Sequence, residues 1–253
     1  MLAQFLPEQI FAFLLVFSRV GTAMMLMPGI GEAYVFARVR LSLALALSLV
    51  LLPLVQSQLP VMPAAPLALL VLIAGEVVQG VIVGGAARLL MSALTIAGMI
   101  ISFQSSLAIA QSFDPNQGTQ TALVGSFLSI LGVLLVFVAG LHTMLIAGIH
   151  DSYELFPVGR LPPAGDLATL VVGIVSSAFA IGVQMSAPFI VYGMVFYIGL
   201  GIIQRLIPQI QLFFIMMPAQ LMFAFFVIMV VLSTTLLVFL GHFEEQASRF
   251  LAP

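Results

Sequence analysis

Four tracts without a single charged side chain constrain this sequence more than any other feature. Each is longer than the roughly 20 residues that an α-helix needs to cross the hydrocarbon core of a bilayer, which is about 30 Å thick. The tracts are Leu41–Gly75, Pro115–His150, Leu167–Gln204 and Leu206–Phe243. Since charged side chains keep protein surfaces in water, these tracts predict a surface that faces lipid or other apolar protein.

The composition supports a membrane-facing surface, and the continuously apolar runs favour helices over strands. Hydrophobic residues make up 62% of the chain and charged residues 6%, whereas a soluble domain carries about 25% charged residues. A membrane barrel needs strands of about 10 residues that alternate apolar and polar side chains, but these runs are continuously apolar. We therefore predict an all-α membrane protein of kinked helices and hairpins. No polar stretch is long enough for a separate domain, so residues 1–253 are expected to form one helical domain.

The expected helices follow from the apolar segments and from the proline and glycine residues between them. Proline and glycine mark helix ends or kinks at Pro28-Gly29, at Pro53, at residues 60–66, 114–118 and 157–165, and at Pro188 and Pro208. The segments themselves lie at about 9–31, 40–55, 66–87, 88–111, 120–149, 167–203 and 209–241. We expect the long sixth segment to contain a break.

Several function classes are excluded or disfavoured by residues that the chain lacks. It has no cysteine and no lysine, so it can form neither a disulfide, nor a thiolate metal site, nor a phosphate-binding loop of the Walker type. Net charge is −2 and the seven arginines are scattered, so no nucleic-acid partner is expected. His142 and His150 lack a supporting carboxylate cluster, and the neighbouring types in His150-Asp151-Ser152 do not define a triad. We expect no metal, no cofactor and no catalytic residue.

Charges inside apolar stretches predict contacts with other helices or chains. Each such charge costs several kcal/mol in hydrocarbon unless it is paired. In one helix Glu76 and Arg88 would lie about 18 Å apart along the axis, too far to pair. Between them, Gly80 and Gly84 form a pattern of small residues that allows close approach of a second helix. Subunit contacts are predicted at Arg19, Glu76, Arg88, Arg205 and Gln209.

The stretch from Gly98 to Gly125 differs from the rest because polar, uncharged residues interrupt it. Such a mixture suits a loop inside an aqueous passage, and it suits an ordinary solvent-exposed connection equally well. The polar residues are Gln104, Ser105, Ser106, Gln111, Ser112, Asp114, Asn116, Gln117, Thr119, Gln120 and Thr121.

A set of ordered motifs resembles the flagellar biosynthetic protein FliR family and its injectisome homologues. The motifs cover nearly the whole chain. They are Arg19-Val20-Gly21, Met27-Pro28-Gly29-Ile30-Gly31, Arg38-Val39-Arg40 with a Leu/Ala run to Pro53, Gly75-Glu76 through Gly84, Gly98 through Asp114-Pro115 and Gly118, and residues 205–213.

This resemblance implies a subunit of a type III export gate in the bacterial inner membrane, at the flagellar basal body. It implies partners as well: several copies of two smaller helical subunits (FliP-like and FliQ-like), a substrate-switching membrane protein (FlhB-like) and exported unfolded polypeptides. The polar loop is then expected to line or plug the channel. The residues with this expected role are Gln104, Ser105, Ser106, Gln111, Ser112, Phe113, Asp114, Pro115, Asn116, Gln117 and Thr119.

The main alternative is a secondary transporter for a small solute. Such proteins are commonly built from paired repeats with broken helices and bind their substrate near the middle of the membrane. The sequence shows no internal repeat, and Glu76 is its only candidate acid. An intramembrane enzyme would need a nucleophile and a base, or metal ligands, that converge in one site. No such set is present.

Overall fold

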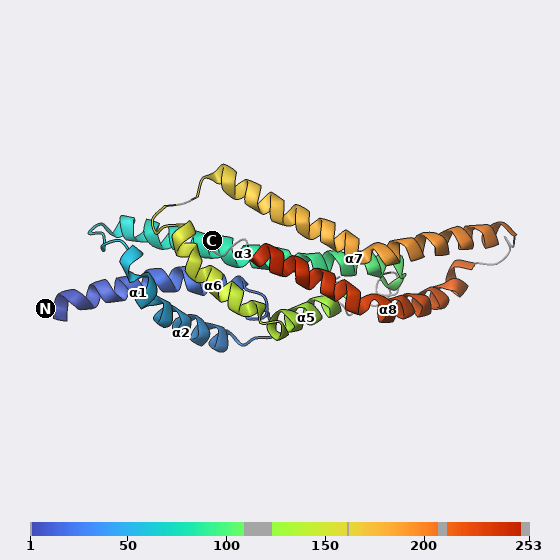
Figure 1. The fold of residues 1–253 in the computed structure, drawn as a ribbon, viewed down its shortest axis with the longest axis horizontal. Helices are drawn as coiled ribbons and strands as arrows, with labels where there is room; N and C mark the ends of the chain where they lie inside the picture. The colour runs from blue at the N-terminus through green and yellow to red at the C-terminus, as the bar shows by residue number, and fades with distance from the viewer. Residues whose placement is uncertain (1, 109–122, 161, 207–211, 249–253) are drawn as a thin grey trace. The chain divides into compact units, whose positions relative to one another are not determined.

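The computed structural model describes residues 2–108, 123–160, 162–206 and 212–248 (Figure 1). These residues form helices joined by short connections, with no strand among them, and this confirms the prediction of an all-α fold. The elements are α1 (Leu2–Leu26), α2 (Ala37–Val55), the short 3-10 helix η1 (Gln56–Gln58), α3 (Pro66–Gln104), α5 (Leu123–Val138), α6 (Leu141–Leu155), α7 (Ala164–Leu206) and α8 (Leu212–Ser248).

Five of these helices are long and apolar enough to cross a membrane, namely α1, α2, α3, α7 and α8. Helix α3 has 39 residues and α7 has 43. At 1.5 Å per residue such helices are about 58 and 64 Å long, roughly twice the thickness of the hydrocarbon core. They therefore do not fit within that core unless they are strongly tilted.

Three boundaries differ from those expected from the sequence. Helix α3 is continuous through Arg88, where two segments were predicted, because arginine is itself a good helix former. Helix α7 is likewise continuous, with Pro188 inside it, so the predicted break is absent. The segment predicted at 120–149 is instead divided between α5 and α6 at Gly140, whose φ of 74° lies in the left-handed region that glycine tolerates best.

Other boundaries agree with the proline and glycine signals. Helix α1 ends at Leu26, just before Pro28-Gly29, and Gly29 has a φ of 83°. Helix α3 begins at Pro66, a position where proline is favoured because its missing N–H has no partner in a first helical turn. Pro53 lies inside the last turn of α2 rather than beyond it.

The described residues group into two compact units. Unit 1 takes them from Met1–Leu90, Val136–Val175 and Phe243–Pro253, and unit 2 takes them from Met91–Leu135 and Ser176–His242. Helices α3, α5, α7 and α8 each contribute to both units, so no single linker separates them. The organisation of residues 1–253 as one domain stays a prediction.

Unit 1 is built around an apolar core of α1, α2 and α6. Side chains from all three helices are fully or almost fully buried there, which is the arrangement that removes most apolar surface from solvent. The core residues are Val16, Val20, Ala23, Met24, Met27, Ala44, Leu51, Val55, Ile149 and Tyr153.

Unit 2 is packed through small residues on neighbouring helices. A Cβ atom added at Gly98 of α3 would collide with the backbone of Gly125 in α5, so these helices touch backbone to backbone. A Cβ at Gly132 of α5 would strike the side chain of Leu94, and one at Gly182 of α7 would crowd Ile96. Glycine is therefore required where α5 and α7 approach α3.

Candidate functional site

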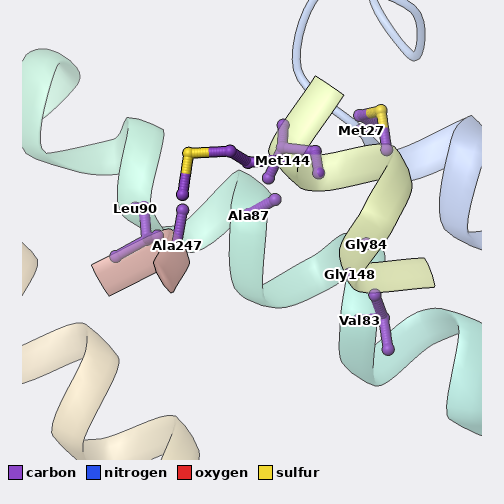
Figure 2. Close-up of a pocket in the computed structure, with 9 residues that line it drawn as sticks. Met27, Val83, Gly84, Ala87, Leu90, Met144, Gly148 and Ala247 are labelled. Carbon is purple, nitrogen blue, oxygen red and sulfur yellow. The ribbon is translucent and has the colours of Figure 1, made fainter. Parts of the chain in front are cut away.

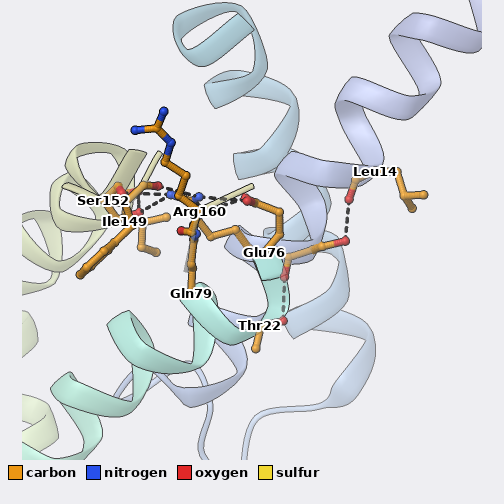
Figure 3. A network of polar contacts seen from close by, with 10 residues as sticks. Leu14, Thr22, Glu76, Gln79, Ile149, Ser152 and Arg160 are labelled. Carbon is orange, nitrogen blue, oxygen red and sulfur yellow. Dashed lines mark hydrogen bonds and ion pairs between the residues drawn. The ribbon is translucent and has the colours of Figure 1, made fainter. Parts of the chain in front are cut away.

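Arg19 of α1 is fully buried and lies in a polar cluster of unit 1; Figure 3 labels Glu76, Gln79, Ser152 and Arg160 of this cluster. The Nε of Arg19 donates to Glu76 Oε2 at 2.8 Å and its Nη2 donates to Glu76 Oε1 at 3.1 Å. Nη2 also donates to the side-chain oxygen of Gln79 and to the carbonyl oxygen of Phe156, the latter at 3.0 Å. Nη1 donates to the carbonyl oxygen of Ser152 at 3.0 Å. All three guanidinium nitrogens are thus hydrogen-bonded.

This cluster is closed to solvent. Arg19, Glu76 and Gln79 are each 0% exposed, and the Tyr153 ring packs against the guanidinium with its centroid 3.9 Å from Cζ. A buried ion pair offsets its desolvation cost only when the geometry is good and further hydrogen bonds satisfy both groups. The two parallel bonds between Arg19 and Glu76, together with the carbonyl acceptors, meet that condition.

The connection after α6 is tied to the same cluster. The Nε2 of Gln79 donates to the carbonyl oxygen of Arg160 at 2.8 Å. The Glu76 carboxylate accepts a hydrogen bond from the backbone N–H of Gly159, whose φ of 80° again suits glycine. Helices α1, α3 and α6 and residues 156–160 are therefore fastened at one point. Ser152, Tyr153 and Gly159 carry no sequence signal of this role, because each is an ordinary residue of a helix or turn.

Close contact between α1 and α3 brings the two charges together. A Cβ atom at Gly80 would meet the carbonyl oxygen of Arg19, and one at Gly84 would meet the carbonyl oxygen of Ala23. The helix approach predicted from this glycine pair is confirmed. The sequence argument that Glu76 needs a partner on another helix is confirmed too, and the partner is in the same chain. A subunit contact is therefore not needed to explain Arg19 or Glu76.

A second polar cluster lies in unit 2, around Gln220 of α8. The Nε2 of Gln220 donates to the carbonyl oxygen of Gln104 at 2.8 Å and to Tyr197 Oη at 3.3 Å, and its Oε1 accepts from Ser106 Oγ at 2.7 Å. The carbonyl oxygen of Gln220 accepts from Tyr192 Oη at 2.9 Å. With Gln220 only 3% exposed, this amide fastens the end of α3 to α7 and α8.

Ser105 and Ser106 form the base of the polar stretch in which they were predicted to face a lumen. Both are buried in unit 2, at 3% and 1% exposure, so the structure places their hydroxyls inside the chain. The Ser105 hydroxyl donates to the carbonyl oxygen of Ser102 at 3.2 Å. Ser106 has a φ of 57°, the only positive φ at a described non-glycine residue. Half-buried Gln104 lies against α7, where a Cβ at Gly193 would strike its amide.

The other predicted site residues are not brought into either cluster. Arg88 and Arg205 are exposed and form no ion pair with any residue that the structure describes. The remaining predicted residues lie outside the described residues: Gln209, Gln111, Ser112, Phe113, Asp114, Pro115, Asn116, Gln117 and Thr119. Their expected roles stay predictions.

A small cavity in unit 1 has no features of a ligand site (Figure 2). Its volume of about 20 Å³ is room for about one water molecule. The lining is apolar, so a water there would have few hydrogen-bond partners and the cavity is expected to be dry. The lining residues are Met27, Val83, Gly84, Ala87, Leu90, Met144, Leu145, Gly148 and Ala247.

The sequence His150-Asp151-Ser152 does not form a triad. His150 Nδ1 lies 2.8 Å from Asp151 Oδ1, so these two neighbours are in contact. Ser152 instead belongs to the Arg19 cluster, and its hydroxyl donates to the carbonyl oxygen of Ile149 at 2.6 Å. A serine held in this way is a structural hydrogen-bond partner rather than a nucleophile.

Together these features define the class of protein. Its long helices expose apolar faces, while its buried charge is paired within the chain, as expected of an integral membrane protein whose solvent is lipid and neighbouring protein. The chain belongs to the family of bacterial export proteins, family 1, which matches residues 10–246.

Proteins with similar sequences support this family assignment. The chain is 39% identical over 242 residues to the flagellar biosynthetic protein FliR of Caulobacter vibrioides, which covers 96% of both chains. It is 29% identical to the FliR protein of Bacillus subtilis, over 90% of this chain and 88% of that one. It is also 26% identical to the Yop proteins translocation protein T of Yersinia pestis, over 66% of this chain and 65% of that one. The resemblance to the FliR family is thereby confirmed, and the chain is an inner-membrane subunit of a type III protein-export apparatus.

Proposed function

We propose that this chain forms part of the export channel itself and that the polar stretch following Ser106 closes it between substrates. The partners in this proposal are several FliP-like and FliQ-like subunits, a FlhB-like protein and unfolded polypeptides in transit. The family gives the chain a transport role, and the name of the Yersinia relative refers to translocation of proteins. The transported molecule is then a polypeptide, and the chain needs no catalytic residue or cofactor.

The buried amide of Gln220 is the observation that carries this proposal. A segment that closes a channel must move at its tip while its base stays fixed. Gln220 holds the backbone at Gln104 and the hydroxyl of Ser106, directly before the polar stretch begins. This buried attachment supports an anchored closing segment over an ordinary surface connection, which needs no such attachment.

The composition of the stretch suits contact with a passing chain. Pro115 and Gly118 disfavour a regular helix. The amides and hydroxyls between Gln111 and Thr119 can hydrogen-bond to water or to the backbone of any polypeptide. Asp114 is the only charged residue there, so the stretch would not hold substrates by charge.

The alternative function as a solute transporter loses its candidate acid. Glu76 is fully buried and already bonded to Arg19 and to the N–H of Gly159. A carboxylate that binds ions or protons during transport must be reached from water at some stage. Glu76 is better explained as the partner of Arg19.

Deletion of residues 112–120 tests the proposal. We expect the variant to assemble with its partner subunits and to raise the flux of small ions across vesicles or cells that contain the whole export apparatus. The matched control replaces the same residues with a glycine-serine linker of equal length, which keeps the connection and removes the native side chains. Unchanged ion flux in a correctly assembled deletion variant would contradict the proposal.

A further inference from the structure

Helices α1 and α2, with the connection between them, form a hairpin that has the dimensions of two membrane spans. Helix α1 has 20 residues from Pro7 to Leu26 and α2 has 19, and the two helices pack against each other in unit 1 (Figure 1). At 1.5 Å per residue they are about 30 and 28 Å long, which matches the thickness of the hydrocarbon core. The two ends of this hairpin are therefore expected to lie at the two surfaces of the membrane.

The two ends of the hairpin differ in charge. The connection and the first turn of α2 contain Arg38 and Arg40, with Glu32 as the only acid there. At the other end, residues 56–66 contain no charged side chain, and α1 carries Glu8. Arg38 is exposed and Arg40 is half-buried, and neither forms an ion pair with a residue that the structure describes. The positive end of the hairpin thus presents two cations that the described chain does not neutralise.

Exposed aromatic and apolar side chains lie beside these arginines in the sequence. Phe36 is 80% exposed, Tyr34 is 61% exposed, and Val39 is exposed between the two arginines. Aromatic rings are enriched where a membrane span meets water, and a neighbouring arginine can extend its guanidinium to the headgroups while its stem stays in apolar surroundings. The exposed large side chains farther along α2 are aliphatic: Leu41, Leu43, Leu45, Leu49, Val50 and Leu54. This order is typical of a helix that enters a bilayer from its headgroup layer.

A turn between α5 and α6 indicates a membrane surface at the same end of unit 1. Met27, Ala87 and Met144 line one small cavity, so the end of α1, the middle of α3 and the first part of α6 meet there. The turn at Gly140 lies about one helical turn before Met144, and Val138 beside it is 76% exposed. A lipid-exposed turn does not occur within the hydrocarbon core, because its backbone polar groups would lack partners. This turn therefore favours a position in the headgroup layer for the connection after α1 as well.

We propose that Arg38 and Arg40 bind the phosphate groups of anionic phospholipids, with Tyr34 and Phe36 beside them in the headgroup layer. A guanidinium can donate two parallel hydrogen bonds to one phosphate. Residues two positions apart point to different sides of a helix, so the two arginines contact separate lipids. The net negative charge of an anionic lipid also attracts basic residues at the membrane surface, and a zwitterionic lipid lacks this charge. The proposal rests on the place of the chain in the inner membrane and does not depend on how the channel is closed.

A lipid titration of the assembled export complex tests the role of the two arginines. The complex is placed in nanodiscs of phosphatidylcholine with an increasing share of phosphatidylglycerol, and a fluorescent amino acid at exposed Ala33 reports on the connection after α1. Replacing both Arg38 and Arg40 with glutamine should raise the share needed for the half-maximal fluorescence change by about fivefold or more. Replacing both with lysine should keep most of the response, because lysine retains the cation.

The matched control for this titration is Arg160→Gln, which removes an exposed arginine from the connection after α6. It should leave the half-maximal share at its wild-type value. An unchanged value in the double glutamine variant would overturn the proposal. A fluorescence change of equal size in phosphatidylcholine alone would overturn it too, since the contact would then not depend on lipid charge.

A photo-cross-link in cells that contain the whole export apparatus identifies what lies against the site. A photo-reactive phenylalanine derivative at Phe36 should cross-link to phospholipid, which mass spectrometry detects as an added lipid mass on a peptide of this chain. The same derivative at Phe11, a buried residue of α1, is the control and should give no lipid product. Cross-links from Phe36 mainly to another subunit, or to a second copy of this chain, would refute the proposal.

Discussion

The two buried polar clusters differ in charge and in what they hold. In unit 1, Arg19 and Glu76 form a fully buried ion pair that fastens three helices and the connection after α6. In unit 2, Gln220 makes neutral hydrogen bonds to the end of α3 and to Ser106. A buried ion pair holds the helices around it in place, because separating it leaves an unpaired charge in an apolar interior. A neutral amide can exchange partners at a smaller cost.

We expect the two clusters to have different roles: the ion pair stabilises the fold, and the Gln220 amide takes part in the proposed closure of the channel. The ion pair lies where α1, α3 and α6 meet, and it is fully buried. The amide lies at the start of the polar stretch for which a mobile role is proposed. Variants of the first cluster should therefore affect folding, and variants of the second should affect closure of the channel.

The largest effect is expected from breaking the ion pair. Arg19→Met leaves the Glu76 carboxylate buried without its partner, at a cost of about 3–5 kcal/mol. The amount of folded chain in membranes, measured by resistance to protease, should fall severely. The double variant Arg19→Met with Glu76→Leu removes both charges and should recover part of the loss. A double variant as unstable as the single one would show that the pair is not the main reason for the defect.

A smaller effect is expected from separating α1 and α3. Gly80→Ala places a methyl group against the backbone of Arg19, and overpacking of this kind costs about 1–3 kcal/mol. Gly75→Ala is the matched control in the same helix, since its Cβ meets nothing. Thermal unfolding of the purified complex should show a lower midpoint for Gly80→Ala alone. Equal midpoints would mean that the helices tolerate wider spacing.

Local patterns predicted the helices better than they predicted either cluster. The charge-free tracts gave the helical class, and the glycine pair at Gly80 and Gly84 gave the approach of a second helix. The sequence also indicated that Glu76 needs a partner elsewhere. It did not identify Arg19 as that partner, because the two residues are 57 positions apart and only the tertiary fold brings them together.

The boundaries that were wrong have physical reasons as well. The predicted segments 66–87 and 88–111 meet at Arg88, but α3 continues through this residue because arginine is a good helix former and its side chain is exposed. Ser105 and Ser106 were assigned to an aqueous passage because serine is polar. Burial of their hydroxyls depends on a hydrogen bond from Ser105 to Ser102 and on one from Ser106 to Gln220, a residue 114 positions away.

The neutral cluster should affect closure before it affects stability. Gln220→Leu removes the partners of the Ser106 hydroxyl and of the Gln104 carbonyl, at a cost of about 1–3 kcal/mol. The complex should assemble, but its resting ion flux should increase because the base of the closing segment is loosened. Gln184→Leu, at an exposed position of α7, is the control for loss of a glutamine. If both variants leave the ion flux at its wild-type level while deletion of residues 112–120 raises it, the segment closes the channel without help from Gln220.

The smallest effect is expected at Ser106, where two contributions oppose each other. Its φ of 57° is strained for a residue with a Cβ, at a cost of about 1–2 kcal/mol. Its hydroxyl bond to Gln220 offsets part of this strain, because a typical hydrogen bond contributes about 1 kcal/mol. Ser106→Ala loses the bond and keeps the strain, whereas Ser106→Gly loses the bond and relieves the strain. Thermal unfolding of the complex should therefore show a lower midpoint for the alanine variant than for the glycine variant, which should stay close to wild type. The opposite order would mean that chain flexibility in the unfolded state, which glycine increases, outweighs the strain at this position.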